Sequence, residues 1–551
     1  MERRLWHNHY ETGIANNIPE EKLSSLAHLI DESVHRYQNQ EAFLSMGKSV
    51  SYGEIGKLSD AFAAYLTNDL GLKKGDAIAI QLPNTIQYPV VLFGAIKVGL
   101  VIVNTNPLYT SREMAHQLKD SGAKAIVILD NFASKLEGAL PELTDLKHIV
   151  TTGIGDLLDG AKGHLVNFAV KYIKRMVPGY KLPGAVKLKS ALKAGHGQNF
   201  TRPQLGPEDP AFLQYTGGTS GVLKAAVLRH RNILANVAQL SQWMSKLLVL
   251  GQETVGTAIP LYHIFALTAN CFLFFKAGGR NVLIANPRDM VGFLKEIRHE
   301  KITVLTGVNT LFNGMLNHKD FDKVDFSRLK LTIGGAMAVQ KSVADRWLAK
   351  TGVALSEGYG LTEASPVVAV HPFNKKVKQG SIGLPLPGID VSIRDDAGME
   401  MPLGQAGELC LKGPNVMAGY WKDGELEPIG EDGWLATGDI AYMDETGYVF
   451  IVDRKKDMIL VSGFNVYPNE VEEVIASHPK VLECGVVGIA DEDSNERVKA
   501  FVVRKDDSLT VEEIRKHCKK SLTRYKVPKL VDFRDELPKS PVGKILRRKL
   551  K

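Results

Sequence analysis

The sequence predicts an α/β fold for most of the chain, followed by a small α+β domain at the C-terminus. Short apolar runs alternate with helix-like segments from about residue 50 to about residue 400. Runs such as Ala77–Ile80 and Ala125–Leu129 are apolar throughout, which is typical of parallel strands buried on both faces. Similar strands are expected at Ala211–Tyr215, Lys301–Leu305 and Leu329–Ile333. After about residue 400 turns become frequent, so the architecture is expected to change there.

The longest apolar run, Tyr88 to Asn104, is expected to be buried strand or helix. It contains Lys97 and is too short to cross a bilayer comfortably. No transmembrane helix is therefore expected. The first residues, MERRLWHNHYETG, contain no apolar h-region, so no secretory signal is expected either.

Composition indicates a soluble globular protein of several domains. The chain has 551 residues, 44% hydrophobic and 23% charged, with a mild net charge of +7. Its cysteines, Cys271, Cys410, Cys484 and Cys518, are far apart and show no C-x-x-C spacing. This argues against a zinc site or a disulfide framework and favours a reducing, cytoplasmic location.

The last third of the chain predicts a hairpin and then a compact α+β unit. Gly447 is expected to lie in the turn between strands at 440–443 and 448–452. The unit that follows has about 95 residues, enough to fold alone. Its expected elements are a helix at Pro468–His478, strands at Glu483–Ile489 and Lys499–Val503, a helix at Thr510–Leu522 and a strand at Leu530–Phe533.

The segment from Gly160 to Pro207 contains no Asp or Glu, and its apolar and basic residues are interleaved. A basic amphipathic segment can lie on an anionic membrane surface. An ordinary basic surface insertion explains the same pattern, so both interpretations stay open. No nucleic-acid partner is expected, because no recognition motif accompanies the charge.

The stretch YTGGTSGVLKAAVLRH, Tyr215–His230, contains glycines, hydroxyl side chains and Lys224. Backbone N–H groups freed by glycine, hydroxyls and a lysine are the groups that bind phosphates. It is not a Walker A loop, because Val222 and Leu223 separate Gly221 from Lys224. It is not a dinucleotide G-x-G-x-x-G either, because its first two glycines are adjacent. Taken alone, it could also be a polar turn after a strand.

Further motifs follow this loop in order: GGAMAV (Gly334–Val339), EGYGLTE (Glu357–Glu363), GELCLKGPNVMAGYW (Gly407–Trp421), DGWLATGDI (Asp432–Ile440), VDRKKDMILVSGFNVYPNEVE (Val452–Glu472) and PKSPVGKILRR (Pro538–Arg548). From about residue 25 onwards the chain resembles the adenylate-forming superfamily of acyl-CoA synthetases, luciferases and the adenylation domains of peptide synthetases. PLYHIFALTANC, NPRDM and FRDELPKS make it most similar to bacterial long-chain fatty acid–CoA ligases.

The resemblance implies a large N-terminal domain, residues 1–452, of layered, mostly parallel sheets with helices and a distorted β-barrel. A hinge at 453–457 and a small mobile domain at 458–551 would follow. The implied reaction activates a fatty acid with ATP and Mg²⁺ to an acyl-adenylate, releasing pyrophosphate. The acyl group then passes to coenzyme A. Peripheral membrane contact through residues 160–207 and a homodimer are further partner hypotheses.

The resemblance also assigns residues. The triphosphate loop would comprise Thr216, Gly217, Gly218, Thr219, Ser220, Gly221 and Lys224, and Glu363 with Thr216 would hold Mg²⁺. The adenine and α-phosphate surroundings would comprise Gly335, Ala336, Gly358, Tyr359, Gly360 and Thr362. Asp439 would accept the ribose hydroxyls, with Arg454 nearby.

Lys544 is the residue expected to carry adenylation, assisted by Lys224. Lys456 lies at the hinge position, and Gly463 and Phe464 would border the pantetheine path of the thioester step. His263 would border the acyl pocket, although a histidine in an apolar run is more often a satisfied core residue. Trp243 is a candidate gate of the acyl pocket.

The loop departs from the family pattern at Ala225, where a glycine usually follows the lysine. A methyl there could slow turnover if the backbone needs a conformation that only glycine tolerates. Alternatives therefore stay open: a ligase for aromatic or medium-chain acids, transfer of the acyl group to a carrier protein, or a non-catalytic fatty-acid or nucleotide-binding protein.

Overall fold

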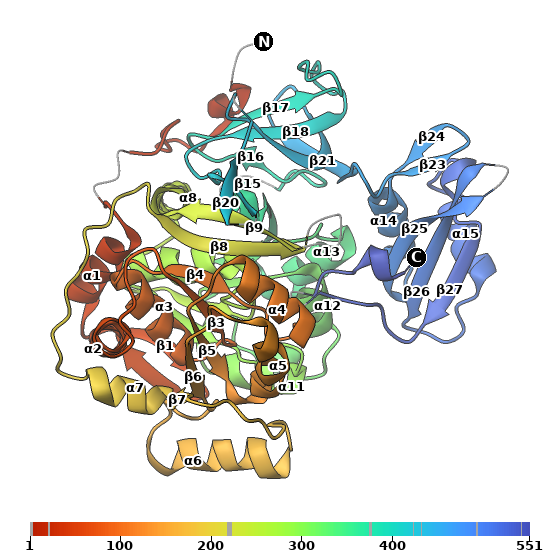
Figure 1. The fold of residues 1–551 in the computed structure, drawn as a ribbon. Coiled ribbons are helices and arrows are strands. Elements are labelled where there is room, and N and C mark those ends of the chain that lie inside the picture. The colour runs from red at the N-terminus through yellow and green to blue at the C-terminus, as the bar shows by residue number, and fades with distance from the viewer. Residues whose placement is uncertain are drawn as a thin grey trace.

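The computed structural model describes residues 4–19, 23–217, 223–373, 377–422, 424–430, 432–491, 494–540 and 543–550. Figure 1 shows a large N-terminal body and a smaller C-terminal domain beside it, with the C-terminal tail running back toward the large body. The α/β fold with a small C-terminal α+β domain is therefore confirmed.

One large mixed sheet has parallel strands at its centre and an antiparallel edge formed by β9, β19 and β20. Its strands, in sheet order, are β20 (Glu425–Pro428), β19 (Gly419–Lys422), β9 (Leu223–Arg229), β8 (Pro210–Gly217), β4 (Val101–Asn104), β3 (Ala77–Gln81), β5 (Ala125–Leu129), β6 (His148–Thr152) and β7 (Val186–Lys187). The strands predicted within β3, β5 and β8 are confirmed.

Another large sheet repeats the plan, with β1 and β10 to β14 forming parallel pairs. Its strands, in sheet order, are β16 (Leu384–Pro385), β15 (Val367–Val370), β14 (Leu355–Gly360), β13 (Leu331–Gly334), β12 (Val304–Gly307), β10 (Thr254–Thr257), β11 (Arg280–Leu283), β1 (Glu41–Ser45) and β2 (Lys48–Ser51). The strand predicted at Lys301–Leu305 begins later, at Val304, because Lys301 takes a left-handed turn conformation with φ of 46°.

Helices fill the space between the two sheets and cover their outer faces. The middle layer contains α1 (Leu26–Tyr37), α2 (Tyr52–Ala64), α3 (Gln87–Lys97), α8 (His230–Trp243) and α10 (Leu273–Lys276). The outer layers contain α4 (Ser111–Asp120) and α5 (Ala133–Ala139) on one side, and α11 (Met290–Ile297), α12 (Asn309–Leu316) and α13 (Lys341–Thr351) on the other.

Strand β3 shows why its sequence is apolar throughout. Ile78 and Ile80 face the middle layer, whereas Ala77 and Ala79 face the outer helices α4 and α5. Alternate side chains therefore enter different cores, so a polar side chain at any position of the strand would be buried. The run from Tyr88 to Asn104 is likewise buried, as α3 followed by β4. In the part of the chain that the structure describes, no helix is long and apolar enough to cross a membrane.

At the place of the expected barrel lies an antiparallel sheet of β17 (Asp390–Arg394), β18 (Gly407–Lys412), β21 (Leu435–Met443) and β22 (Val449–Arg454). Gly447, with φ of 79°, turns the chain between β21 and β22 as predicted. The C-terminal domain then packs α14 (Pro468–Ala476) and α15 (Val511–Cys518) on a sheet of β23 (Ile459–Val461), β24 (Phe464–Val466), β25 (Val481–Asp491), β26 (Asn495–Arg504) and β27 (Leu530–Arg534). Its predicted elements occur in the predicted order.

Candidate active site

The candidate site lies where parallel strands end. Gly307 of β12, Gly334 of β13 and Glu357 of β14 are in register at the carboxyl edge of the sheet. In open α/β sheets this edge is where ligands bind. At two positions there the neighbouring atoms lie so close that only glycine fits. A Cβ on Gly335 would lie 2.8 Å from the Phe265 ring, and one on Gly360 would lie 2.3 Å from the Pro366 carbonyl oxygen.

Ala336, directly after these glycines, has φ of 63°. A left-handed conformation costs a residue with a Cβ roughly 1–2 kcal/mol, so the surrounding structure must enforce it. Such strain concentrates at functional sites. Gly335 and Ala336 therefore stand at a constrained bend beside Gly358 of β14, the strand that also carries Tyr359 and Gly360.

Asp439 is the centre of the polar contacts at this edge. It is only 4% exposed, and the Tyr359 hydroxyl donates to its Oδ2 at 2.5 Å. Arg454 Nε lies 3.1 Å from Oδ1. Burial, with the Asp439 charge adding to it, raises the pKa of Tyr359 well above its usual range, so the phenol stays a donor. A buried carboxylate is thus held in place by two donors from different elements.

Lys544 reaches this cluster from the C-terminal tail. Burial, together with the Arg454 guanidinium, lowers the pKa of Lys544 to about 8, although the Asp439 charge opposes the decrease. The backbone around it forms a tight turn in which Lys544 N–H donates to Ser540 Oγ at 3.1 Å. Ser540 N–H donates in return to the Lys544 carbonyl at 2.7 Å. The Lys544 ammonium is thus desolvated and lies near enough to Arg454 and Asp439 for their charges to shift its pKa.

His263 lies on the same side of the cleft, at the start of the short helix α9 (Ile264–Ala266). Its Nδ1 accepts from the Phe265 N–H at 3.3 Å, so the ring proton is assigned to Nε2. Burial lowers the pKa of His263 to about 4, and the Lys544 charge acts in the same direction. At neutral pH His263 is therefore an uncharged donor beside a charged lysine.

A second cluster gathers the residues predicted for phosphate and metal. Tyr420 of β19 donates its hydroxyl to Glu363 Oε1 at 2.9 Å, and the Lys224 ammonium lies 5.4 Å from the centre of the Tyr420 ring. Thr216 pairs with Lys224 at the end of the β8–β9 ladder. Thr362 and Glu363 open the short helix η8 (Thr362–Ala364), which begins three residues after Tyr359. The loop residues Gly218, Thr219, Ser220 and Gly221 lie outside the described residues.

The second cluster offers oxygen ligands of the kind Mg²⁺ takes. Glu363 supplies a carboxylate and Thr216 a hydroxyl, both hard oxygen donors. Among the described residues, no group of three or more His, Cys, Asp or Glu side chains is placed to hold a metal ion. One carboxylate can suffice for Mg²⁺, because this ion keeps several waters and usually arrives with substrate phosphates.

Some predicted residues lie apart from these clusters. Gly463 and Phe464 are on the β23–β24 hairpin at the outer end of the C-terminal domain, where Phe464 stacks on Tyr525 at 4.8 Å. Trp243 is 2% exposed and donates its indole N–H to the His371 carbonyl at 3.2 Å. Lys456 follows β22, and burial and the Arg454 charge lower its pKa.

Ala225 occupies a regular strand position. It pairs with Tyr215 of β8 and with Trp421 of β19, and its methyl is buried in the core beside β8. Its φ is not in the left-handed region. The departure from glycine therefore requires no special backbone conformation, which removes the reason for expecting slower turnover.

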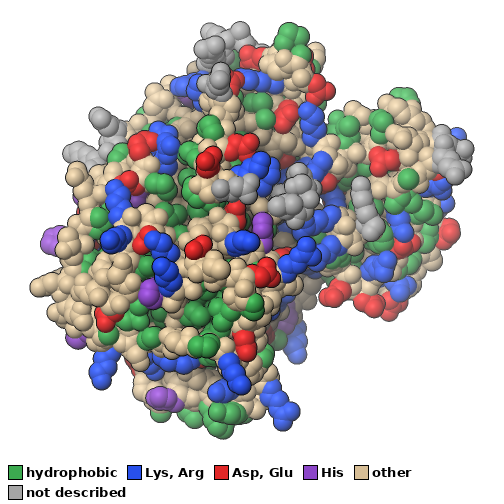
Figure 2. Space-filling view, viewed as in Figure 1, with side chains coloured by type: hydrophobic (Ala, Val, Ile, Leu, Met, Phe, Trp, Pro, Cys, Tyr) green, Lys and Arg blue, Asp and Glu red, His purple; other side chains and the backbone are tan. Residues whose placement is uncertain are grey.

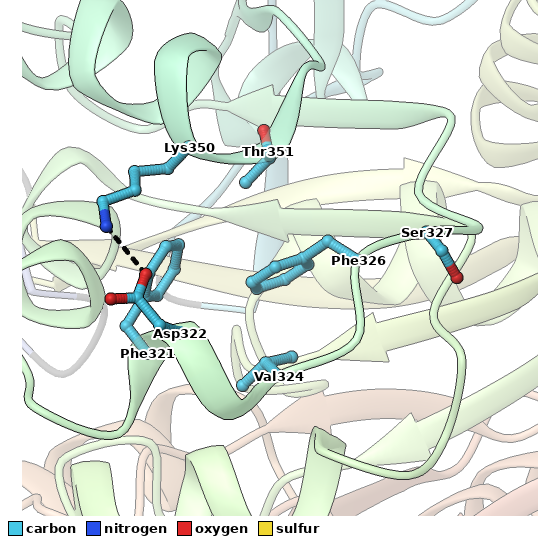
Figure 3. A pocket seen from close by; sticks show the side chains of 7 residues that line it. All are labelled: Phe321, Asp322, Val324, Phe326, Ser327, Lys350 and Thr351. Atoms are coloured by element: carbon cyan, nitrogen blue, oxygen red, sulfur yellow. Dashed lines mark hydrogen bonds and ion pairs between the residues drawn. The ribbon is translucent and has the colours of Figure 1, made fainter.

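A surface pocket of about 270 Å³ lies at the opposite edge of the sheet (Figure 3). It is lined by Phe321, Asp322, Val324, Phe326, Ser327, Lys350 and Thr351, and the Lys350 ammonium closes one side by pairing with Asp322 at 2.8 Å. Thr351 ends α13 just before β14 begins, so the pocket is at the amino ends of the strands. It is separate from the candidate site.

The sequence did not single out Tyr420 or Thr437. Tyr420 lies inside the GYW run and links Lys224 to Glu363, and Thr437 Oγ1 accepts from the Asp439 N–H at 3.1 Å. Both residues lie within motifs that the sequence analysis quoted, and this was the signal that could have identified them. Their contacts with Glu363, Lys224 and Asp439 become visible only in the structure.

Known proteins match this chain in sequence and in fold. A model of the AMP-binding enzyme family matches residues 30–421, and a model of the AMP-binding enzyme C-terminal domain matches residues 470–544. A long-chain-fatty-acid–CoA ligase of Escherichia coli O6:H1 is 54% identical over 550 residues, covering 100% of this chain and 98% of that protein. A ligase of the same name from Haemophilus influenzae is 49% identical, with coverage of 100% and 98%.

Solved structures share the fold. ATP-bound MatB from Rhodopseudomonas palustris superimposes with a TM-score of 0.80 at 28% identity, covering 96% of this chain and 98% of MatB. The anthranilate CoA ligase AuaEII in complex with anthranoyl-AMP gives a TM-score of 0.84 at 23% identity, covering 96% and 97%.

Proposed function

The chain belongs to the AMP-binding enzyme family, and we propose that it is a long-chain fatty acid–CoA ligase. The observation that carries this is the approach of Lys544 to Asp439 and Arg454 at the carboxyl ends of β12 to β14. It supports a site in which a lysine, a buried carboxylate and a guanidinium act on one ligand. The full-length similarity to long-chain-fatty-acid–CoA ligases supports the substrate class.

In the first step a carboxylate oxygen of the fatty acid attacks the α-phosphorus of ATP, and the bond to pyrophosphate breaks. Because two anions must meet, catalysis is mainly positioning and charge stabilisation. The Lys544 ammonium stabilises the carboxylate and α-phosphate oxygens, and Asp439 fixes the ribose. Lys224 and the loop 216–221 hold the β- and γ-phosphates. Glu363 and Thr216 would hold Mg²⁺, which supplies neutralisation of phosphate charge when bound.

In the second step the coenzyme A thiol attacks the acyl carbon of the adenylate, and AMP leaves. His263, as an uncharged Nε2–H donor, borders the acyl end of the cleft. Gly463 and Phe464 lie away from Lys544 in this arrangement, so their use in the thioester step requires the C-terminal domain to turn about residues 453–457. The exposed Phe464 ring is then available to border the pantetheine path.

The function is tested with a series of acids. Purified protein is supplied with ATP, Mg²⁺ and coenzyme A, and with acids from short to long chain, benzoate and anthranilate. Pyrophosphate release and acyl-CoA mass are measured. We expect the highest kcat/KM with long-chain acids. Activity confined to aromatic acids, or pyrophosphate release with no acid, would contradict the proposal.

The pKa of Lys544 predicts a pH dependence. The ammonium form is needed for adenylation and is present below a pKa of about 8 in the free enzyme. Since kcat/KM reports ionisations of the free enzyme, kcat/KM for ATP is expected to fall as pH rises through about 8. The arginine of Lys544→Arg stays charged above pH 12. The fall in kcat/KM near pH 8 should therefore be absent from the residual activity of that variant. If kcat/KM of Lys544→Arg still falls near pH 8, the ionisation that causes the fall belongs to another group.

We also propose that the segment around α6 (Gly160–Phe168) and η5 (Ala169–Ile173) contacts an anionic membrane surface. Its inner face is tied to the domain, because Gly163 packs against the Gly155 carbonyl and Asn167 Oδ1 accepts from the Gly155 N–H at 2.8 Å. The outer face bears exposed apolar side chains: Leu165 (66% exposed), Phe168 (56%), Tyr172 (60%), Ile173 (71%) and Met176 (55%).

Basic side chains surround this apolar face, and Figure 2 shows hydrophobic and basic groups together at the lower edge of the molecule, over α6. Lys162, Lys171, Lys174 and Arg175 are all exposed. Apolar side chains that enter the headgroup region, rimmed by cations that pair with lipid phosphates, are the features of an interfacial helix. A substrate that partitions into membranes makes this contact useful.

Substituting the outer face should release the protein from vesicles. For Leu165→Ser/Phe168→Ser/Tyr172→Ser we expect partition onto vesicles containing phosphatidylglycerol to fall by about tenfold or more, since losing only about 1.4 kcal/mol of apolar transfer is a factor of ten. Cosedimentation measures it, with Met399→Ser, an equally exposed apolar residue elsewhere, as the control. Equal binding of the triple variant would contradict the assignment.

A further inference from the structure

The C-terminal tail carries Lys544 as a fixed part of the C-terminal domain. Ile545 and Leu550 pack against Val487 and Phe501 of that domain's sheet. Arg547, three residues after Lys544, pairs with Glu472 of α14 at 2.7 Å and with Asp453 at 2.9 Å. Leu537, which precedes Lys544, is buried in the same cluster. Because the tail is anchored before and after Lys544, it cannot place Lys544 independently. The position of the whole domain therefore decides where the Lys544 ammonium lies.

Helix α12 of the large domain has an apolar and a polar face. Phe312 and Met315 are buried in the core beneath the sheet. Thr310, Asn313 and Asn317 recur at spacings of three and four residues, which places them on one side of the helix and its C-terminal end. We call these three residues the α12 polar face. In Figure 1 the C-terminal tail passes next to α12.

The α12 polar face touches the C-terminal domain at separate segments. Thr310 Oγ1 donates to the Gly543 carbonyl at 3.2 Å, directly before Lys544. Asn313 Nδ2 donates to the Leu482 carbonyl in β25 at 3.2 Å. Asn317 Oδ1 accepts from Lys505 Nζ, just after β26, at 3.2 Å. Because the partners come from distant parts of the domain, a single rotation of the domain would break all of these bonds together.

The large domain holds Asn313 ready for this contact. Asn313 is 8% exposed, and its Oδ1 accepts from Arg346 Nη1 at 3.3 Å and from Asn317 Nδ2 at 2.9 Å. With its oxygen occupied, the amide must turn its nitrogen toward Leu482. When the C-terminal domain leaves, a nearly buried donor loses its protein partner. Such a donor favours the docked position.

We propose that the α12 polar face is the docking surface that holds the C-terminal domain in the position that places Lys544 in the cleft. Thr310, Asn313 and Asn317 are thus positioning residues for acyl-adenylate formation. They act through the domain and not on the substrate. The inference rests on the proposed ligase function for its catalytic consequence, but the docking itself is a property of the two domains.

Separating the half-reactions tests the catalytic consequence. For Asn313→Ala we expect single-turnover acyl-adenylate formation from ATP and fatty acid to slow by about tenfold, the effect of one lost hydrogen bond of about 1.4 kcal/mol. Thioester formation from supplied acyl-adenylate and coenzyme A should stay unchanged or become faster. Equal losses in both half-reactions would overturn the proposal, because they would indicate general damage.

A substitution at an exposed residue distinguishes loss of docking from misfolding. Lys505 is exposed, so Lys505→Ala should slow adenylation by about threefold without lowering the unfolding midpoint. Lys529→Ala makes the same charge change at another exposed site of the same domain and should leave both half-reactions unchanged. Loss of adenylation in Lys529→Ala as large as in Lys505→Ala would attribute the effect to charge and overturn the docking role.

A distance measurement tests docking without activity. The native Cys271, Cys410, Cys484 and Cys518 are buried, so spin labels can be directed to Lys319→Cys and Asp507→Cys on either side of the contact. We expect the short-distance population to fall when Asn313→Ala is added to the full-length protein. An unchanged distance distribution overturns docking even if the enzyme is active. A changed distribution in a protein that activates no acid upholds docking and refutes the proposed function.

Discussion

Lys544→Ala is expected to slow acyl-adenylate formation by about 100- to 1000-fold, the usual loss when one preorganised electrostatic donor is removed. Lys544 is desolvated beside Asp439 and Arg454, where its charge acts in a medium of low polarity. Pyrophosphate release in a single turnover measures the effect. Thioester formation from supplied acyl-adenylate should be retained, because we propose that this step takes place after the C-terminal domain has turned about residues 453–457 and has carried Lys544 out of the cleft.

The substitution should not unfold the protein. Burial lowers the pKa of Lys544 in the folded state, so protonation opposes folding throughout the pH range below about 8. Alanine removes that destabilising charge, and the unfolding midpoint should stay level or rise. Lys549→Ala makes the same change of charge on an exposed residue of the same tail and should leave activity intact. Full adenylation activity in Lys544→Ala would refute the role of Lys544.

Central strands of the large sheets, such as β3 and β5, were predictable because they are buried on both faces and are therefore apolar at almost every position. Where the chain is only half-buried or turns, local signals were weaker. The strand expected from Lys301 begins at Val304, since a left-handed lysine is not visible in a residue pattern. The helix predicted to reach Leu522 ends at Cys518, where Lys519 to Leu522 form a turn instead. The antiparallel register of β17 with β18 likewise depends on packing between distant segments.

The site residues were predicted from motifs, but their roles depend on contacts across domains. Lys544 and Asp439 are over one hundred residues apart, and no spacing rule brings them together. The resemblance assigned both residues to one reaction, and the structure shows that the Asp439 charge acts on Lys544. Asn313 shows the opposite case, because an asparagine on an amphipathic helix carries no sequence signal. Only the contact with Leu482 indicates that it faces another domain.

Asp439→Asn is expected to weaken ATP binding by about 100-fold, or about 2.7 kcal/mol. Both carboxylate oxygens already accept protein donors, Tyr359 at 2.5 Å and Arg454 at 3.1 Å, and keep lone pairs for the ribose hydroxyls. An amide offers one acceptor oxygen. Its NH₂ must therefore either face the Arg454 guanidinium, donor against donor, or face the Tyr359 hydroxyl, and the ribose hydroxyl on that side loses its acceptor. Hydrogen bonds to a charged group contribute about 1.5–3 kcal/mol each, so losing the ribose bonds reaches this magnitude. Titration calorimetry with ATP and no fatty acid measures it.

Matched variants separate the contacts of Asp439 with the ribose from the hydrogen bond that Tyr359 donates to Asp439. Tyr359→Phe keeps the ring and the Asp439 charge but loses one donor, so ATP affinity should fall by only about threefold to tenfold. Asp396→Asn removes a carboxylate that is 89% exposed and pairs with Lys455 beside the same hinge, and it should leave ATP affinity unchanged. If Tyr359→Phe weakens ATP binding as much as Asp439→Asn, the carboxylate acts by holding the tyrosine and not by binding the nucleotide. The ribose assignment of Asp439 would then fail, because the hydrogen bond between the two side chains would account for the whole effect.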